Sequence, residues 1–291
     1  MTYLTKEDWQ NTYVQIICDD KSFSDCFQEK MKIFSDFSFL LQKILKTKET
    51  FPKKLFQRTL YSSLIFFHKY VIYNGISIST LSLADRLTLY STCIFLSFKI
   101  INKLIDLETI SSKFQNLFNE GKNIKYEIED ICELITKKEF EILTSIQFQA
   151  NIDWPYDYFN LIRDYLTNIE IGNNSIKNII NLINIKINTI IVFPLYLYYT
   201  PVEILISALV LIIEEYKLNN VNINELIEMN GLDIDKGNIE ECSKLIDKVI
   251  KQKKVFDEEK NSDININKTA KDNIAKEEIN FNTIPSIQTN N

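Results

Sequence analysis

The chain has 291 residues, of which 45% are hydrophobic, and its formal net charge is −6. This length predicts one or two domains with a substantial core. Only 5 glycines and 5 prolines disfavour a turn-rich β sandwich or a glycine-rich nucleotide-binding fold. The negative charge argues against a general binder of nucleic-acid phosphates.

The cysteine pattern and the apolar windows indicate the compartment. Five scattered cysteines, none in CxxC spacing, favour reduced thiols over a disulfide framework or a zinc site. The N-terminus has no apolar signal-peptide core. The most apolar window, Val202 to Ile213, is twelve residues long, whereas a bilayer span needs about 20. We therefore expect a chain of the nucleus or cytosol without a membrane partner.

Apolar residues recur at helical spacing through the first half of the chain. Ser24 is the expected N-cap of the first helix, and Asn74 followed by Gly75 is the expected end of the second. The helices are predicted at about 24–46, 54–73, 84–102, 107–118 and 126–147.

A break at 151–155 opens a second group of helices. The third of them begins with a capping box, Thr200 and Glu203, with Pro201 at the first helical position. Beyond Phe256 the chain is polar and is predicted to be disordered over 259–291. The helices are predicted at about 155–168, 175–192, 201–217, 223–230 and 239–257.

The two groups have the pattern of a structural repeat. Each has about five helices, and the third is the most apolar in both. Small residues such as Ser91 and Ser207 would let neighbouring helices pack closely around these third helices. We predict an all-α fold with two tandem five-helix units and flanking N- and C-terminal helices. The expected divisions are 1–50 as an N-terminal segment, 51–150 and 151–258 as the units, and 259–291 as the tail.

Two charged residues interrupt apolar helix faces. Lys99 follows an uncharged run from Leu87 to Phe98 and shares its face with Phe95. Glu139 lies in a row of apolar residues: Ile128, Cys132, Ile135, Ile142 and Ile146. An unpaired buried charge costs several kcal/mol, so each of the two needs a partner. Two opposite charges on apolar helices therefore predict a site.

These residues, in this order, resemble the cyclin family over roughly residues 25–255. The third helix of the first box contains TCIFLSFKI with Lys99 near its end, and EFEILTSIQF places Glu139 nine positions before Phe148. DWPYDYFNLIRDYL opens the second box, and YLYYTP precedes its third helix. With the helices at 24–46 and 239–257, the chain is most similar to the cyclin H type.

The resemblance implies a non-catalytic regulatory subunit that binds and activates a cyclin-dependent kinase. In the family, Lys99 and Glu139 would hold each other and contact the kinase near its mobile αC helix. The cyclin H type implies the CDK-activating kinase, a RING-finger assembly factor and TFIIH as partners. It places the protein in the nucleus, in cell-cycle control and RNA polymerase II transcription, without a cofactor, a metal or direct nucleic-acid contact.

Several alternatives stay open at this point. Phe95, Ile135, Ile142 and Ile146 belong either to the kinase-binding surface or only to the core. Taken without the family, the Lys99–Glu139 pair is an ordinary tie between two helices. A transcriptional cyclin of the C, K, L or T type is the alternative within the family. A cyclin-fold basal transcription factor of the TFIIB kind ranks lower, because it expects a zinc ribbon and a basic face.

The remaining candidates are weaker. Lys99 leads into Ile100, where many cyclins carry an acidic pair, and Phe56 to Leu60 lack the docking motif of mitotic cyclins. These departures leave the kinase partner open. His68, the single histidine, has no Ser, Cys or carboxylate clustered with it in sequence, so we expect a partly buried helix residue without a catalytic role.

Overall fold

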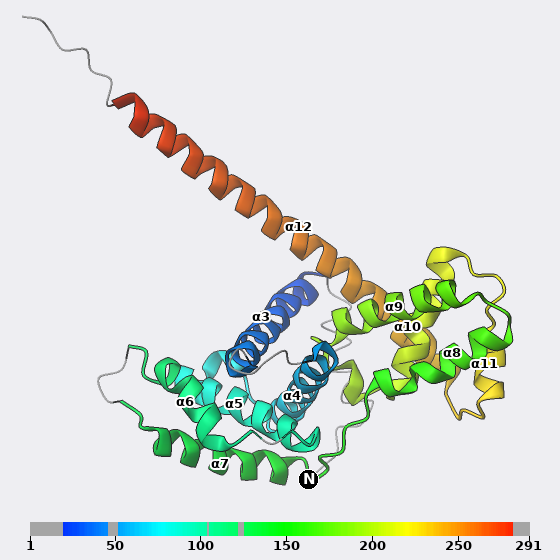
Figure 1. Ribbon diagram of the computed structural model, residues 1–291, viewed down its shortest axis with the longest axis horizontal. Helices are drawn as coiled ribbons and strands as arrows, with labels where there is room; N and C mark the ends of the chain where they lie inside the picture. Colours follow the sequence, from blue (N-terminus) through cyan, green and yellow to red (C-terminus); the bar gives the residue numbers. More distant parts are fainter. Residues whose placement is uncertain (1–19, 46–51, 104, 122–124, 282–291) are drawn as a thin grey trace, which may run out of the picture.

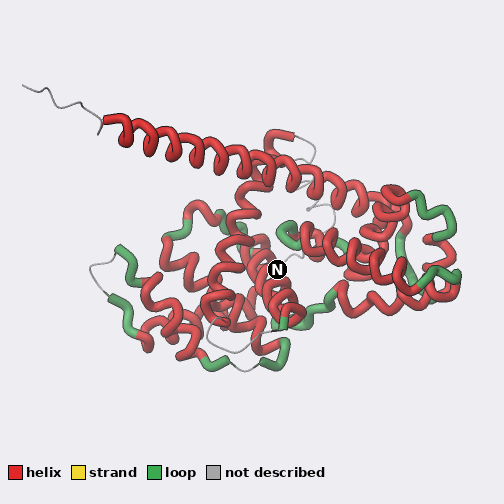
Figure 2. The backbone as a smooth tube through the Cα atoms, turned by 45° about the horizontal axis from the view of Figure 1, so that its top comes forward, coloured by secondary structure: helices red, strands yellow, loops and turns green. Residues whose placement is uncertain are grey.

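The computed structural model describes residues 20–45, 52–103, 105–121 and 125–281, and within these ranges it contains helices and no strand (Figures 1 and 2). Side chains are described for these residues except 20–22, 53–54 and 259–281. The α-helices of the first half are α3 (Asp20–Leu45), α4 (Lys53–Tyr73), α5 (Leu83–Ile100), α6 (Leu107–Phe118) and α7 (Ile128–Ser145). Those of the second half are α8 (Phe159–Asn168), α9 (Asn173–Ile190), α10 (Pro201–Tyr216), α11 (Ile223–Met229) and α12 (Lys236–Phe281). The all-α architecture is therefore confirmed.

Local sequence signals explain most helix ends. The side chain of Ser82 accepts a hydrogen bond from the Asp85 amide at the start of α5. The predicted capping box of Thr200 and Glu203 opens α10. Gly75, with φ +60°, follows α4 in the left-handed conformation that glycine adopts without strain. Ser24 is not an N-cap, because α3 already begins at Asp20.

The C-terminal helix is longer than the sequence pattern predicts. We expected a helix to about residue 257 and a disordered tail, whereas α12 continues through Phe281. No glycine or proline occurs between Gly237 and Pro285, so no residue in this stretch breaks the helix. Residues 282–291 lie outside the described part of the chain. Figures 1 and 2 show the last turns of α12 extending away from both bundles.

Each half is built around its third apolar helix. All residues of α5 from Leu87 to Phe98 are buried, and α5 packs against α3, α4, α6 and α7. The residues from Glu203 to Leu209 of α10 are also buried. However, α10 packs mainly against two helices, α9 and α12, and two short 3₁₀ segments, η3 (Pro155–Tyr158) and η4 (Pro194–Leu197). Because α3 packs with α4, α5 and α6, the first five-helix bundle is α3–α7 and includes a helix that we had placed outside the unit.

Helix α3 also reaches the second half. The ring centroids of Phe23 and Phe27 lie 5.4 and 5.8 Å from that of Phe193, which precedes η4. Phe27 also meets Phe256 of α12 edge-on, at 5.8 Å between centroids. The Gln252 amide donates a hydrogen bond of 3.2 Å to the Ser24 hydroxyl. Aromatic packing of this kind joins the beginning of the described chain to its last helix.

Helix α4 forms a second seam between the halves. The Arg58 guanidinium lies 4.6 Å from the centroid of the Trp154 ring and forms an ion pair with Asp157. His68 and Tyr196 share a hydrogen bond between Nδ1 and the phenol oxygen. His68 is fully buried, where we had expected partial exposure. Burial, with a smaller contribution from the charge of Lys30, holds the pKa of His68 well below its usual 6.5.

Candidate functional site

Lys99 and Glu139 form the ion pair that the sequence predicts. Nζ of Lys99 lies 2.6 Å from Oε1 of Glu139, which joins the last turn of α5 to the middle of α7. A cation in the last turn of a helix interacts favourably with the helix dipole. The pair thus occupies the point at which α5 leaves the core of the first bundle.

The two partners differ in their exposure to solvent. The Lys99 side chain is 48% exposed, whereas that of Glu139 is 14% exposed. We had argued from a buried lysine, but the buried run of α5 ends one residue earlier, at Phe98. The helix closes at Ile100, and Asn102 follows in the left-handed conformation with φ +54°. Lys99 therefore lies at the rim of the core and needs no deep desolvation.

This geometry leaves Lys99 able to bind a partner. Its ammonium has three N–H donors, and Glu139 is its hydrogen-bond acceptor within the described part of the chain. The ammonium also lies 4.3 Å from the centroid of the Phe95 ring, a cation–π contact that fixes its position. The remaining N–H donors of Lys99 can bind carbonyl oxygens of another chain, while the more buried Glu139 on α7 orients the lysine.

The four apolar residues predicted beside this pair lie in the core. Ile135 and Ile142 have no exposed surface, and Ile146 and Phe95 are 4% and 9% exposed. Of the two readings that the sequence left open, this burial favours the core. Their role at the site is to hold α5 against α7 and so to fix the distance between Lys99 and Glu139.

Two exposed aromatic residues lie near the pair on α7 and the turn after it. Phe140 is 65% and Phe148 61% exposed, and their rings meet edge-on at 6.5 Å between centroids. Gln147 and Phe148 both have a left-handed backbone, with φ of 53° and 57°, which costs about 1 kcal/mol or more for such residues. Strain and exposure together are typical of a functional position.

The sequence motif EFEILTSIQF contains both Phe140 and Phe148, but neither was among the predicted site residues. Phe140 directly follows Glu139 and falls outside the apolar row of α7, so it is an aromatic residue on a polar helix face. Exposed apolar side chains that adjoin one another form a candidate contact surface. The signal in the sequence that could have identified Phe140 was its position outside the apolar row of α7.

A second ion pair on α7 has a different character. Lys138 bonds Glu141 and the Tyr70 hydroxyl, and its ammonium lies 5.4 Å from the Tyr70 ring centroid. Burial opposes the charge of Lys138, but its bonds to Glu141 and Tyr70 outweigh that effect and raise its pKa. This cluster ties α7 to α4.

The described residues contain neither a candidate metal site nor a candidate membrane-spanning helix. They contain no group of three or more His, Cys, Asp or Glu side chains that could hold a metal ion. In the same part of the chain, no helix combines the length and the apolar content needed to cross a bilayer.

The sequence and the structure of the chain were compared with those of known proteins. No protein-family model matches the chain, and no curated protein matches its sequence. A chain in the cryo-EM structure of the yeast TFIIK (Kin28/Ccl1/Tfb3) complex is similar, with a TM-score of 0.51 and 18% identity, over 84% of this chain and 95% of that chain. The similar chain is Ccl1, a cyclin.

A second solved structure is more distant. It is the CAK complex of Chaetomium thermophilum bound to ATP-γ-S, with a TM-score of 0.47 and 14% identity. The alignment covers 76% of this chain and 63% of that chain, so this chain spans less than two thirds of it. The helix order of the two halves and the likeness to Ccl1 together give the conclusion that this chain has the all-α cyclin fold.

Proposed function

We propose that this chain is a non-catalytic cyclin that binds and activates a cyclin-dependent kinase through the surface around Lys99 and Glu139. The observation that carries the proposal is the 2.6 Å pair at the exposed end of α5, in a cyclin fold, with the aromatic residues Phe140 and Phe148 beside it. Together they combine oriented hydrogen-bond donors with an apolar anchor.

The proposed mechanism needs no chemistry from this chain. A kinase of this class is active when its αC helix lies inward and its own Lys–Glu pair and activation segment are in place. A rigid surface that binds only the inward position shifts the kinase toward it. Lys99 would donate to backbone carbonyls beside αC, and Phe140 and Phe148 would pack against its apolar residues.

The kinase that we propose is the CDK-activating kinase, with a RING-finger assembly factor as a further partner and TFIIH as the larger assembly. The likeness to a chain of the yeast TFIIK complex, Kin28/Ccl1/Tfb3, supports this choice. The corresponding location is the nucleus, with the cytoplasm as a second compartment. The biological role would be in transcription and cell-cycle control.

The test is affinity purification of the full chain from its own cells, followed by mass spectrometry and a kinase assay on the eluate. Lys99→Ala combined with Glu139→Ala should lower kinase activity at least about tenfold, the loss expected when a contact at the centre of an interface is removed. Helix content should stay unchanged, because a half-exposed ion pair contributes about 0–1 kcal/mol to stability.

The matched control is another ion pair between helices, Lys186–Glu215, which joins α9 to α10 at 2.9 Å in the second half. Alanine at both of these positions should leave kinase activation unchanged. Full activity of the Lys99/Glu139 double variant would remove this surface from the kinase interface. Recovery of no kinase in repeated preparations would overturn the proposed function itself.

A further inference from the structure

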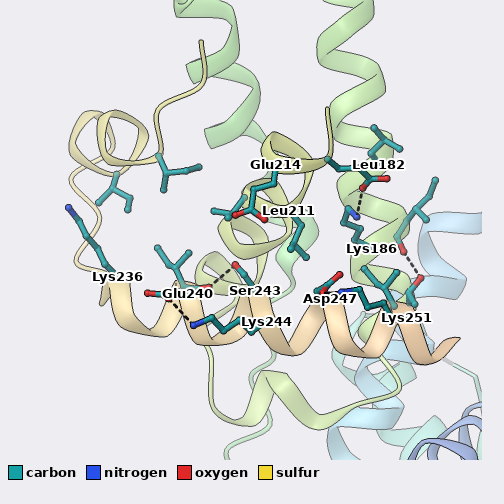
Figure 3. Close-up of a pocket in the computed structure, with 18 of the residues that line it drawn as sticks. Leu182, Lys186, Leu211, Glu214, Lys236, Glu240, Ser243, Lys244, Asp247 and Lys251 are labelled. Atoms are coloured by element: carbon teal, nitrogen blue, oxygen red, sulfur yellow. Dashed lines mark hydrogen bonds and ion pairs between the residues drawn. The ribbon is translucent and has the colours of Figure 1, made fainter. Parts of the chain in front are cut away.

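A groove of about 980 Å³ lies on the second half of the molecule, away from Lys99 and Glu139 (Figure 3). One wall is α12, and the other is formed by α9, α10 and α11. The wall opposite α12 has apolar side chains, among them Leu182, Leu211 and Ile227, beside the charged side chains of Lys186, Glu214 and Glu215. Ile185 at its rim is 60% exposed. An open apolar surface of this size is typical of a binding site.

The α12 wall presents a regular row of charges. Its charged lining residues are Lys236, Glu240, Lys244, Asp247, Lys251 and Lys254. They recur at steps of three or four residues, so they share one helix face over about 27 Å. Figure 3 shows Glu240, Lys244, Asp247 and Lys251 in succession along this face. The groove thus has the length of a helix of five turns.

The charges of this row are only weakly satisfied within the chain. Lys244–Glu240 and Lys251–Asp247 are pairs one turn apart on α12, and the first is more than 70% exposed on both sides. Exposed pairs of this kind contribute little to stability, because solvent screens the two charges. Lys236 and Lys254, at the two ends, have no carboxylate partner among the described residues. The row can therefore accept charges from another helix.

The same helix supplies a segment of matching length. Residues 259–281 of α12 extend from the body without a neighbouring helix in Figures 1 and 2. These 23 residues span about 35 Å as a helix. In proteins, most of the stability of a helix comes from packing one of its faces against neighbouring elements. One end of α12 thus lines a groove, and the other end has no neighbouring helix among the described elements.

We propose that residues 259–281 of a second copy of this chain occupy the groove, antiparallel to α12, in a twofold symmetric dimer. The twofold axis would pass α12 near Glu258, so that each copy fills the groove of the other. An arrangement of this kind is closed and self-complementary. It leaves the surface around Lys99 uncovered, and it does not depend on the proposed kinase partner.

The order of charges in the sequence supports the antiparallel register. Along the groove, the charges from Glu240 to Lys251 alternate as acidic, basic, acidic, basic. Lys276, Asp272 and Lys268 follow one another at steps of four residues and alternate in the opposite sense. In an antiparallel register they lie opposite Glu240, Lys244 and Asp247. Complementary charges along paired helices set their partner and direction.

Apolar residues of the extension lie on the opposite helix face. Ile266, Ala270 and Ile274 are spaced by four residues, and each is offset by two positions from the charged row. A helix placed between two walls would thus have a charged face toward α12 and an apolar face toward α9 and α10. The α12 wall is charged, and the opposite wall supplies apolar side chains such as Val210 and Leu211.

The test measures the mass of the full chain by sedimentation velocity and light scattering across a dilution series up to about 100 µM. We expect a dimer that dissociates on dilution, and a monomer when the chain is cut after Glu258. Lys244→Glu should raise the dissociation constant about tenfold, and so should Asp272→Lys. The two changes combined should restore the dimer. Lys137→Glu, an exposed lysine of α7, is the matched control and should leave the dissociation constant unchanged.

The outcomes separate this dimer from other occupants. A full chain that stays monomeric throughout the series overturns the proposal, because the proposed occupant of the groove is a second copy of the chain. A dimer that survives the cut after Glu258 assigns the contact to a different surface. Two charge reversals that weaken the dimer further when combined would exclude the register.

Discussion

The two halves of the molecule share a plan but differ in how they surround their central helix. In the first half α5 packs against four helices, whereas in the second α10 packs mainly against two helices and two short 3₁₀ segments. The first half is therefore closed, and its candidate site is a rim of exposed side chains. The second half leaves one side of its bundle open as a groove. The half with the more complete helix packing thus has its candidate site on the surface, and the other half has a groove.

The hydroxyl groups of the two central helices show the same difference. Ser91 in α5 donates to the carbonyls of Leu87 and Thr88, in its own helix. Ser207 in α10 donates to the carbonyl of Ile239 in α12, at 3.1 Å. Ser91 is thus satisfied within its own helix, whereas Ser207 joins two helices.

The largest effect should come from truncating the two central helices. Phe98→Ala in α5 and Ile212→Ala in α10 each leave a cavity in a fully packed site, at a cost of about 2–5 kcal/mol of unfolding free energy. Because the seams through Phe193 and Tyr196 join the halves, calorimetry should show a single transition that both variants lower. Two separate transitions, each shifted by one variant, would show that the halves are independent units.

Exposed aromatic residues should matter only in the first half. Replacing Phe140 and Phe148 with Ser should weaken kinase binding by about 2 kcal/mol or more, roughly 30-fold in the dissociation constant. The matched controls are Tyr216 and Met229, each 51% exposed in the second half, and their replacement should leave binding unchanged. Equal losses for both pairs would spread the interface over the two halves.

Phe148 offers a sharper version of this test. Glycine accepts its left-handed backbone without strain, so Phe148→Gly should change the unfolding free energy by no more than about 1 kcal/mol. Binding to the kinase should nevertheless fall. Isothermal titration beside urea unfolding separates the two quantities, and a loss of stability with unchanged binding would give Phe148 a structural role.

The seam at His68 should make stability depend on pH. Its pKa is lowered in the folded chain, so the unfolded chain binds more protons below pH 6.5. The contribution of His68 to the unfolding free energy should therefore be complete above pH 6.5. It should decrease as the pH drops below 6.5, by at most about 1.4 kcal/mol per pH unit. Urea unfolding between pH 7.5 and pH 5.5 measures the slope. His68→Gln should abolish it, and an unchanged slope would assign the effect to other groups.

The smallest effect concerns the hydroxyl groups. Ser207→Ala removes a hydrogen bond between helices and should cost about 1 kcal/mol. Ser91→Ala removes a bond within one helix and introduces the best helix former, so its effect should stay within about 0.5 kcal/mol. Equal values from urea unfolding would remove this distinction between α5 and α10.

Much of the helical plan could be predicted from the sequence. The run from Leu87 to Phe98, the Asn74–Gly75 stop and the Thr200–Glu203 cap are local signals, and each lies where it was expected. The Lys99–Glu139 pair was expected from the resemblance to the cyclin family. The argument from burial applies to Glu139, which is 14% exposed, and not to Lys99, which is 48% exposed.

Features set by distant contacts could not be predicted. The bond between His68 and Tyr196 joins residues 128 positions apart, and no local pattern contains it. The exposure of Lys99 depends on where α5 leaves the core, a matter of one residue that periodicity does not fix. The groove depends on how α12 lies against α9, α10 and α11, which only the assembled structure shows.

The contact between α3 and α12 has a consequence for synthesis of the protein. Ser24 and Gln252 bond to each other across 228 positions of the chain. At about 5–20 residues per second, a ribosome needs roughly 11–46 s between these two residues. Until residue 193 has been made, Phe23 and Phe27 have neither Phe193 nor Phe256 to pack against, and Phe256 follows only after Gln252. The newly made first bundle therefore leaves the ribosome with an uncovered aromatic end, to which a chaperone can bind until the last helix arrives.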